Sequence, residues 1–278
     1  MISVSSSVQI LAAPSSASAT SECHGHVLVS GSYGGEYNAY HAAKWGLRGV
    51  VLNDAGVGKN RAGTRGLDYL DAMHLPGATA DAFTCHIGDG EHMLEKGCIS
   101  YVNQSALALG CERGQSVREC AARMRAGALI EQVLPLLSGG KRHALNYAQK
   151  APPVVCVDAA PMLTADDAGS IAVTGSHAAL FRGRPDNVIQ VAVRAIFFSD
   201  AGVGLDDAGV ARLPTLDPRG IIAGAASHAS AEIGNARSIH DEGVLSRVNA
   251  GAVALGAKPG MRIRDFIIRL RGLWRETA

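Results

Sequence analysis

The sequence repeats itself once. An ungapped shift of 146 residues carries residues 53–58 (NDAGVG) onto 199–204 (SDAGVG), and matching residues continue in this register as far as Arg118. Upstream, with small gaps, residues 29–32 (VSGS) match 173–176 (VTGS). Each copy has about 145 residues, whereas the units of solenoid proteins have roughly 20 to 50. The duplication therefore predicts two similar domains, 1–150 and 151–278, related by a pseudo-two-fold axis.

Short apolar runs alternate with helical patterns in both copies. Runs rich in Val and Ile without strict polar alternation are typical of strands covered on both faces. We expect strands at 8–11, 27–29, 50–52, 78–84, 154–157, 171–173, 195–198 and 223–230, and helices at 37–45, 62–73, 99–109, 116–136 and 263–274. Residues 138–143 and 151–153 resemble a connector. Alternating strands and helices predict an α/β fold of two Rossmann-like units with mainly parallel sheet.

Composition limits the partners. Lys and Arg number 26 against 25 acidic residues, and aromatic residues make up 5%, so we expect neither a nucleic-acid nor a membrane partner. Six cysteines without a C-x-x-C pair are typical of reduced thiols. The apolar run at 8–14 has a counterpart at 155–161, well inside the chain, which favours a strand over a signal sequence. We therefore expect a cytoplasmic protein.

Hydroxyl side chains follow one strand of each copy, where ligands of parallel sheets collect. These residues are Ser30, Ser32 and Tyr33 in the first copy and Thr174, Ser176 and His177 in the second. Hydroxyls and free backbone amides at such a turn can bind a carboxylate, a phosphate or a developing oxyanion. The alternative is that they cap the helix that follows.

A second strand of each copy ends in a carboxylate. Asn53 and Asp54 correspond to Ser199 and Asp200, and each Asp is a candidate general base, metal ligand or helix cap. Lys59 distinguishes the copies, because its counterpart Leu205 cannot carry a charge. A lysine beside Asp54 can hold a substrate carboxylate or transfer a proton; a solvated loop lysine is the alternative.

The third candidate is His86 with Asp89, opposite Glu232 and Asn235. His86 is a candidate acid or base, although a histidine at a strand end often serves only a structural hydrogen bond. A buried, unreactive thiol is the favoured interpretation of Cys85. The sequence contains neither G-x-S-x-G nor G-x-G-x-x-G, and no second Cys/His cluster completes a ligand set, so we expect no cofactor and no metal.

The leading hypothesis is an enzyme that acts on a small anionic metabolite carrying a carboxylate or an amide, with a hydrolase slightly preferred. An isomerase or lyase and a non-catalytic anion-binding protein are the alternatives. The first copy is favoured for the chemistry because it alone combines Lys59 with His86. Apolar stretches at 129–137 and 266–273 predict a homo-oligomer, with burial inside the monomer as the alternative.

Overall fold

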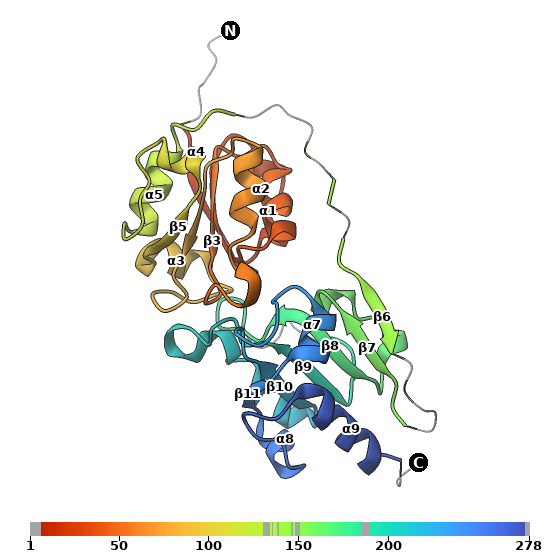
Figure 1. Cartoon of the computed structure of the whole chain (residues 1–278). Coiled ribbons are helices and arrows are strands. Elements are labelled where there is room, and N and C mark those ends of the chain that lie inside the picture. Colours follow the sequence, from red (N-terminus) through yellow and green to blue (C-terminus); the bar gives the residue numbers. More distant parts are fainter. Residues whose placement is uncertain are drawn as a thin grey trace. The chain divides into compact units, whose positions relative to one another are not determined.

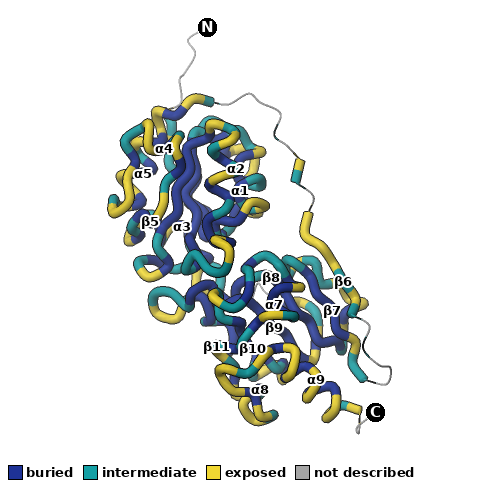
Figure 2. Tube along the Cα trace, in the orientation of Figure 1, coloured by how far each residue is buried: buried dark blue, intermediate teal, exposed yellow. Residues whose placement is uncertain are grey.

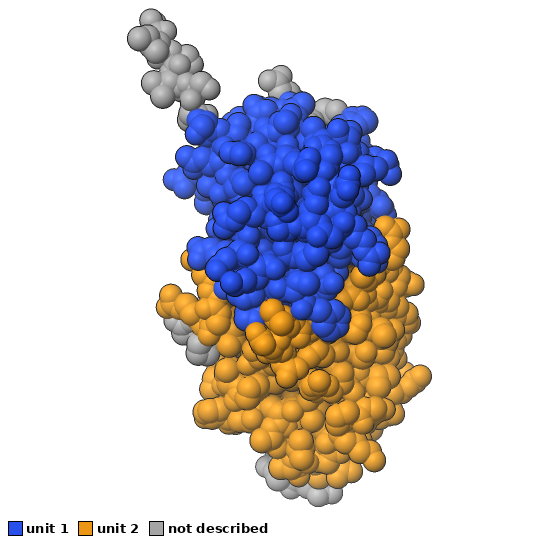
Figure 3. Space-filling view, turned by 90° about the vertical axis from the view of Figure 1, so that its left-hand side faces the viewer, with its two compact units in different colours: residues 1–54, 64–137 blue, residues 55–63, 138–278 orange. Residues whose placement is uncertain are grey.

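The computed structural model describes residues 7–129, 134, 136–137, 139–145, 147, 151–184 and 189–275. The chain forms two compact units (Figure 3). The first consists of Met1–Asp54 and Thr64–Leu137, and the second of Ala55–Gly63 and Ser138–Ala278. The segment 55–63 therefore lies in the second unit, although it follows a strand of the first.

The first unit is a five-stranded sheet with helices on both faces (Figure 1). Its strands lie in chain order, β1 (Ile10–Ala13), β2 (Val27–Tyr33), β3 (Gly49–Asn53), β4 (Gly77–Ala80) and β5 (Ile99–Val102). The first four are parallel, and β5 pairs antiparallel with β4. The helices are α1 (Glu36–Ala43), α2 (Gly66–Ala72), α3 (Gly90–Lys96), α4 (Gln104–Leu107) and α5 (Val117–Met124).

Side chains of β2 are buried on both faces of this sheet. Val27 and Val29 lie in the cluster formed with α3 and α5, whereas Leu28, between them, lies in the cluster with α1 and α2. All three are buried. A strand covered on both faces has no need of alternating polar residues, which explains the uninterrupted apolar runs of the sequence.

The second unit has a six-stranded sheet in the order β11–β10–β9–β8–β7–β6. The central strands β7 (Val154–Val157), β8 (Ile171–His177), β9 (Ala195–Ser199) and β10 (Ile222–Ala226) are parallel. The edge strands β6 (Arg142–Leu145) and β11 (Leu245–Val248) are antiparallel to their neighbours. The helices are α6 (Leu213–Leu216), α7 (Ala236–Glu242), α8 (Ala250–Ala254) and α9 (Ile263–Leu273). Burial falls off at the edge strand β6 (Figure 2).

The α/β architecture with mostly parallel sheets is confirmed. The helix predicted at 99–109 is wrong in its first part, because β-branched and aromatic residues form β5. A helix, α4, does lie within the predicted range, and the Asn103 side chain caps it by accepting from the Ala106 amide. The connector predicted at 138–143 is also wrong in part, since β6 begins at Arg142. The strands predicted at 78–84 and 223–230 end earlier, at Ala80 and Ala226.

The long helix predicted at 116–136 is shorter than expected. A capping box between Ser116 and Glu119 starts α5, which ends at Met124, and residues 130–133 and 135 lie outside the described part. Its expected shorter counterpart α9 has 11 residues against 8 in α5. Phe266, Ile267 and Leu270 of α9 are buried inside the second unit, whereas Ile268 and Leu273 of the same helix are exposed, so most of this apolar stretch is covered within the unit.

Local geometry recurs at matching positions of the two units. The Asn103 side chain accepts from the Gly77 amide (3.0 Å) and donates to the Leu75 carbonyl (2.8 Å). Asn249, 146 residues later, accepts from the Ala223 amide (2.9 Å) and donates to the Ile221 carbonyl (2.8 Å). These matched buried amides support the duplication, which stays a prediction together with its symmetry axis and domain bounds.

Candidate functional site

Each aspartate at the end of the third parallel strand is followed by a strained turn. Val57 has φ 64°, and the Gly58 amide donates to the Gly56 carbonyl at 2.7 Å. Val203 also has φ 64°, with the Gly204 amide donating to the Gly202 carbonyl at 2.7 Å. A hydrogen bond to the second residue back around a positive φ is the rare form of the γ-turn, and a β-branched residue there is strained. Strain of this kind clusters at functional sites.

In the second unit the turn lies next to a pair formed by Asp200 and His228. Asp200 directly follows β9 and is buried, and its Oδ1 accepts from the His228 amide (2.8 Å), the His228 Nδ1 (3.1 Å) and the Gly202 amide (3.0 Å). Burial alone raises the pKa of Asp200, but hydrogen bonds from His228 and Ser246 and attraction to His228 lower it overall. The His228 side chain is 30% exposed. The pair thus joins a buried carboxylate to an accessible imidazole.

The segment 55–63 packs against this histidine within the second unit. The Lys59 amide donates to the His228 carbonyl at 2.8 Å, and the Lys59 ammonium lies 3.0 Å from Glu242 and 3.4 Å from the Ser230 carbonyl. The Asn60 amide side chain donates to Glu232 at 2.5 Å. Lys59 and Glu232, both predicted site residues, therefore lie in the loop region around His228.

A buried cation lies in the same unit. Arg212 precedes α6 and is 2% exposed; its Nη2 donates to the Ala179 carbonyl, while its Nη1 has no hydrogen-bond partner among the described residues. Burial lowers the pKa of Arg212 to about 9. Burial and the charge of Arg212 also lower the pKa of His177 to about 3, so this histidine is neutral. Its Nδ1 accepts from the Ala179 amide at 3.2 Å.

The hydroxyl side chains predicted to bind an anion make internal hydrogen bonds. Ser32 Oγ accepts from the Ser16 amide at 2.9 Å, and the matching Ser176 Oγ accepts from the Ala160 amide at 2.9 Å. Ser30 accepts from the Ser32 amide (3.3 Å), and Thr174 donates to the Phe197 carbonyl (3.2 Å). Their contact with a ligand stays a prediction.

The remaining predicted residues lie in the first unit. Asn53 is buried at the end of β3 and donates to Cys85 Sγ at 3.7 Å, and Asp54 accepts from the Ala82 amide at 3.0 Å. Tyr33 ends β2 and pairs with Asn53 in the register of the sheet. The ring of His86 is stacked on His92, with 3.9 Å between centroids. Asp89 instead caps α3 by accepting from two amides.

Burial raises the pKa of the Cys85 thiol to about 12, which makes it unreactive at neutral pH. The structure thus agrees with the favoured interpretation of this cysteine, a buried thiol. The raised pKa removes Cys85 from the candidate nucleophiles.

Sequence reasoning did not single out His228 or Arg212. The internal register carries His228 onto Ala82 and Arg212 onto Gly66, so both are polar residues that only the second copy has. Applying the comparison used for Lys59 and His86 to every position would have found both.

Among the described residues, no group of three or more His, Cys, Asp or Glu side chains gathers in a way that could hold a metal ion. None of the described helices is both long and apolar enough to cross a membrane. Comparison with models of known families, with curated proteins and with solved structures finds no match to this chain, so the geometry of the His228 region carries the functional argument alone.

Proposed function

We propose that the second unit carries out acid–base chemistry on a small polar, anionic metabolite, with hydrolysis as the favoured reaction. The observation that carries this proposal is the pair of His228 and Asp200. A buried carboxylate that accepts from Nδ1 fixes the orientation and the tautomer of the ring, and Nε2 is the nitrogen that we propose exchanges protons with the substrate.

In the hydrolytic reaction, His228 takes a proton from the water that attacks the carbonyl carbon, and then returns it to the leaving amine or alcohol. Asp200 positions the ring and stabilises its charged form. Lys59 lies beside the His228 loop and is proposed to bind the substrate carboxylate in exchange for Glu242. Removal of a proton from carbon, as in an isomerase or lyase, would use the same histidine.

Binding of an anion without turnover is a second candidate, favoured by the unsatisfied Nη1 of Arg212. A buried donor without a partner costs about 1 to 3 kcal/mol, which an anion would recover. Here Thr174, Ser176 and His177 are the predicted neighbours of the anion. The roles predicted for Asp54 and His86 in the first unit stay predictions.

A chromogenic pair of compounds tests these candidates. We expect the full-length protein to hydrolyse succinic acid 4-nitroanilide faster than the neutral acetic acid 4-nitroanilide, and His228→Gln and Asp200→Asn to abolish this preference by removing turnover. Asp207→Asn is the matched control, because it removes one carboxylate from an exposed loop position paired only loosely with Arg247 (3.8 Å). Thermal stabilisation by the succinyl compound without release of nitroaniline would favour the binding protein, and turnover insensitive to His228→Gln would exclude the proposed mechanism.

We also propose that the protein is cytoplasmic and self-associates. All six cysteines are free thiols, which supports a reducing compartment. The proposal of self-association rests on the apolar stretch before residue 137, of which Leu136 is 82% exposed. Light scattering that gives only the 28.8 kDa species at micromolar concentration would remove it.

A further inference from the structure

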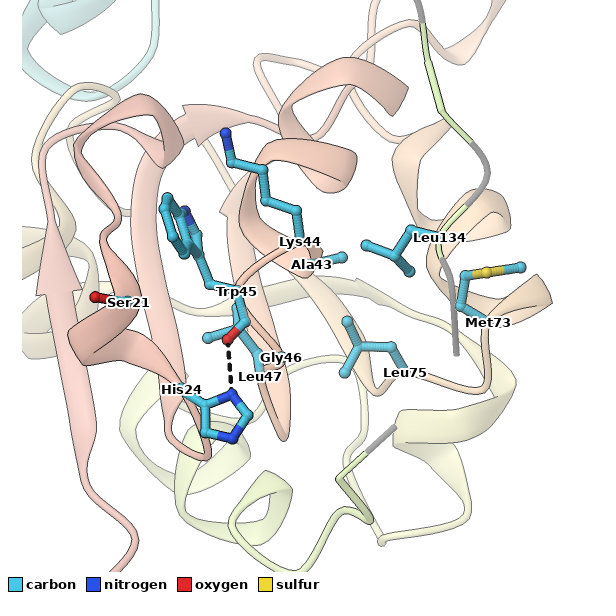
Figure 4. Close-up of a pocket in the computed structure, with 10 residues that line it drawn as sticks. All are labelled: Ser21, His24, Ala43, Lys44, Trp45, Gly46, Leu47, Met73, Leu75 and Leu134. Carbon is cyan, nitrogen blue, oxygen red and sulfur yellow. Dashed lines mark hydrogen bonds between the residues drawn. The ribbon is translucent and has the colours of Figure 1, made fainter. Parts of the chain in front are cut away.

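The first unit contains a pocket that none of the predicted site residues lines. It has a volume of about 600 Å³, within the range of about 300 to 1,000 Å³ that holds small molecules. Its apolar surface comes from Ala43, Leu47, Met73, Leu75 and Leu134. In Figure 4 the indole of Trp45 lies on one side of the pocket, and Met73 and Leu134 lie on the other.

Two of the residues that line the pocket, Lys44 and Trp45, carry hydrogen-bond donors. The Nε1 of Trp45 is buried and has no hydrogen-bond partner among the described residues. The Lys44 ammonium lies 5.1 Å from the centre of the Trp45 ring. A buried donor without a partner is costly, and a cation at the mouth of an apolar pocket attracts an anion.

His24 holds the wall of the pocket in place. Its Nδ1 lies 3.2 Å from the Trp45 carbonyl, as the dashed line in Figure 4 shows. Gly46 follows with φ 67°, and a Cβ there would come within 2.7 Å of the same ring nitrogen. The turn after α1 therefore brings the Trp45 backbone and the His24 ring together at this wall of the pocket.

We propose that this pocket binds a small monocarboxylate with an apolar chain. The carboxylate accepts from Trp45 Nε1 and pairs with Lys44, and the chain lies against Leu47, Leu75 and their apolar neighbours. Burial of each methylene contributes about 0.8 kcal/mol, so a chain of several carbons adds substantially to binding. Lys44 and Trp45 have no counterparts of the same kind at the matching positions of the second unit, because a shift of 146 residues carries Lys44 onto Gln190 and Trp45 onto Val191, which packs on the apolar core.

The protein has two tryptophans, so Trp274→Phe leaves Trp45 as the single fluorescent reporter. Titration of this full-length variant with octanoate should give a saturable change in Trp45 fluorescence. Acetate should give none because it lacks the chain, and octylamine should bind at least about tenfold more weakly because its charge is opposite.

Lys44→Met in the same background should weaken octanoate binding by about tenfold, and the exposed Lys96→Met should leave it unchanged. Octylamine binding as tightly as octanoate, equal effects of the two lysine variants, or the absence of saturation with octanoate would each overturn the proposal. The octylamine comparison needs no mutation of the pocket, so it holds even where Lys44→Met disturbs folding.

Discussion

The two units form the same backbone contact at their strand-end aspartates, but only one adds chemistry to it. The Ala82 amide donates to Asp54 in the first unit (3.0 Å), and the His228 amide donates to Asp200 in the second (2.8 Å). The shared bond holds a buried carboxylate at the end of a strand and needs no particular side chain. His228 adds an imidazole to this arrangement, so the comparison separates the structural role of the aspartate from the catalytic role proposed for it.

The two units also differ at the pocket around Trp45. There the first unit has aromatic and cationic side chains, whereas the second fills the corresponding region with Val191 and Val193, which pack on its core. Each unit thus has one feature that the other lacks. Both proposed sites therefore rest on differences between the two units rather than on their matches.

The largest effect is expected from removing the imidazole. His228→Ala should lower turnover by about 10² to 10⁴, the usual contribution of a general acid–base group, while its backbone bond to Asp200 remains. The steady-state rate of the succinyl nitroanilide measures this effect. The control is Ala82→Ser at the matching position of the first unit, and an equal loss there would erase the distinction between the units.

A large loss of stability is expected from Gly202→Ala. Gly202 has φ 77°, and a Cβ would lie 2.8 Å from the Gly56 Cα, so both backbone strain and a clash with backbone oppose the substitution. We expect a loss of about 2 to 4 kcal/mol in the free energy of unfolding, measured with urea. Gly220→Ala has a similar φ of 67° but open space around its Cβ, and should lose only about 1 kcal/mol. Equal losses would mean that the contact with Gly56 contributes nothing.

The third prediction concerns His177, whose counterpart in the first unit is Tyr33. Its pKa is about 3 in the folded protein against 6.5 for an ordinary histidine, so the unfolded chain takes up the proton first as the pH falls. The contribution of neutral His177 to the free energy of unfolding is therefore fully present above about pH 6.5. It declines by about 1.4 kcal/mol per pH unit as the pH falls toward 3.

His177→Asn retains an acceptor for the Ala179 amide and removes the titrating group. Between pH 6.5 and pH 5, the free energy of unfolding of the variant should fall by about 2 kcal/mol less than that of the parent protein. Parallel curves for the two proteins would show that His177 is not the group responsible.

The smallest effect is expected at the strained turn. Val57→Gly relieves a positive φ at a β-branched residue, but it makes the unfolded chain more flexible, so the two contributions nearly cancel. We expect a change in stability of about 0.5 kcal/mol in the favourable direction. Val203→Gly should gain less, because Val203 also packs on the core. A loss above about 1 kcal/mol at Val57 would mean that the valine side chain, and not the backbone, stabilises the turn.

The strands could be predicted from the sequence because their cause is local. Runs such as 154–157 and 195–198 are apolar on both faces, and the structure has a strand at each. The end of α5 depends instead on a turn at Gly127, whose amide donates to the Met124 carbonyl, and the apolar residues Ala128 and Leu129 that follow are not helical. Periodicity identifies an element better than it identifies the element's end.

The position of Asp200 directly after a predicted strand made it a candidate from the sequence, but its partner His228 could not be predicted in this way. His228 comes 28 residues later, beyond another helix and strand, and only the order of strands in the sheet brings the two together. Lys59 was singled out by its charge, and its role in a site stays a prediction. Its neighbours were not, because no local pattern indicates that residues 55–63 belong to the second unit.

The placement of residues 55–63 has a consequence for how the protein is made. The ribosome completes this segment long before it synthesises Ser230, Glu232 and Glu242, which Lys59 and Asn60 contact. Until then the nascent chain presents an uncovered loop between two strands that can already pair, and four of its non-glycine residues have positive φ: Ala55, Val57, Asn60 and Arg61. A protease or a chaperone acting during synthesis would meet the protein first at this loop. Expression of residues 138–278 alone would likewise yield a second unit that is missing a part synthesised earlier.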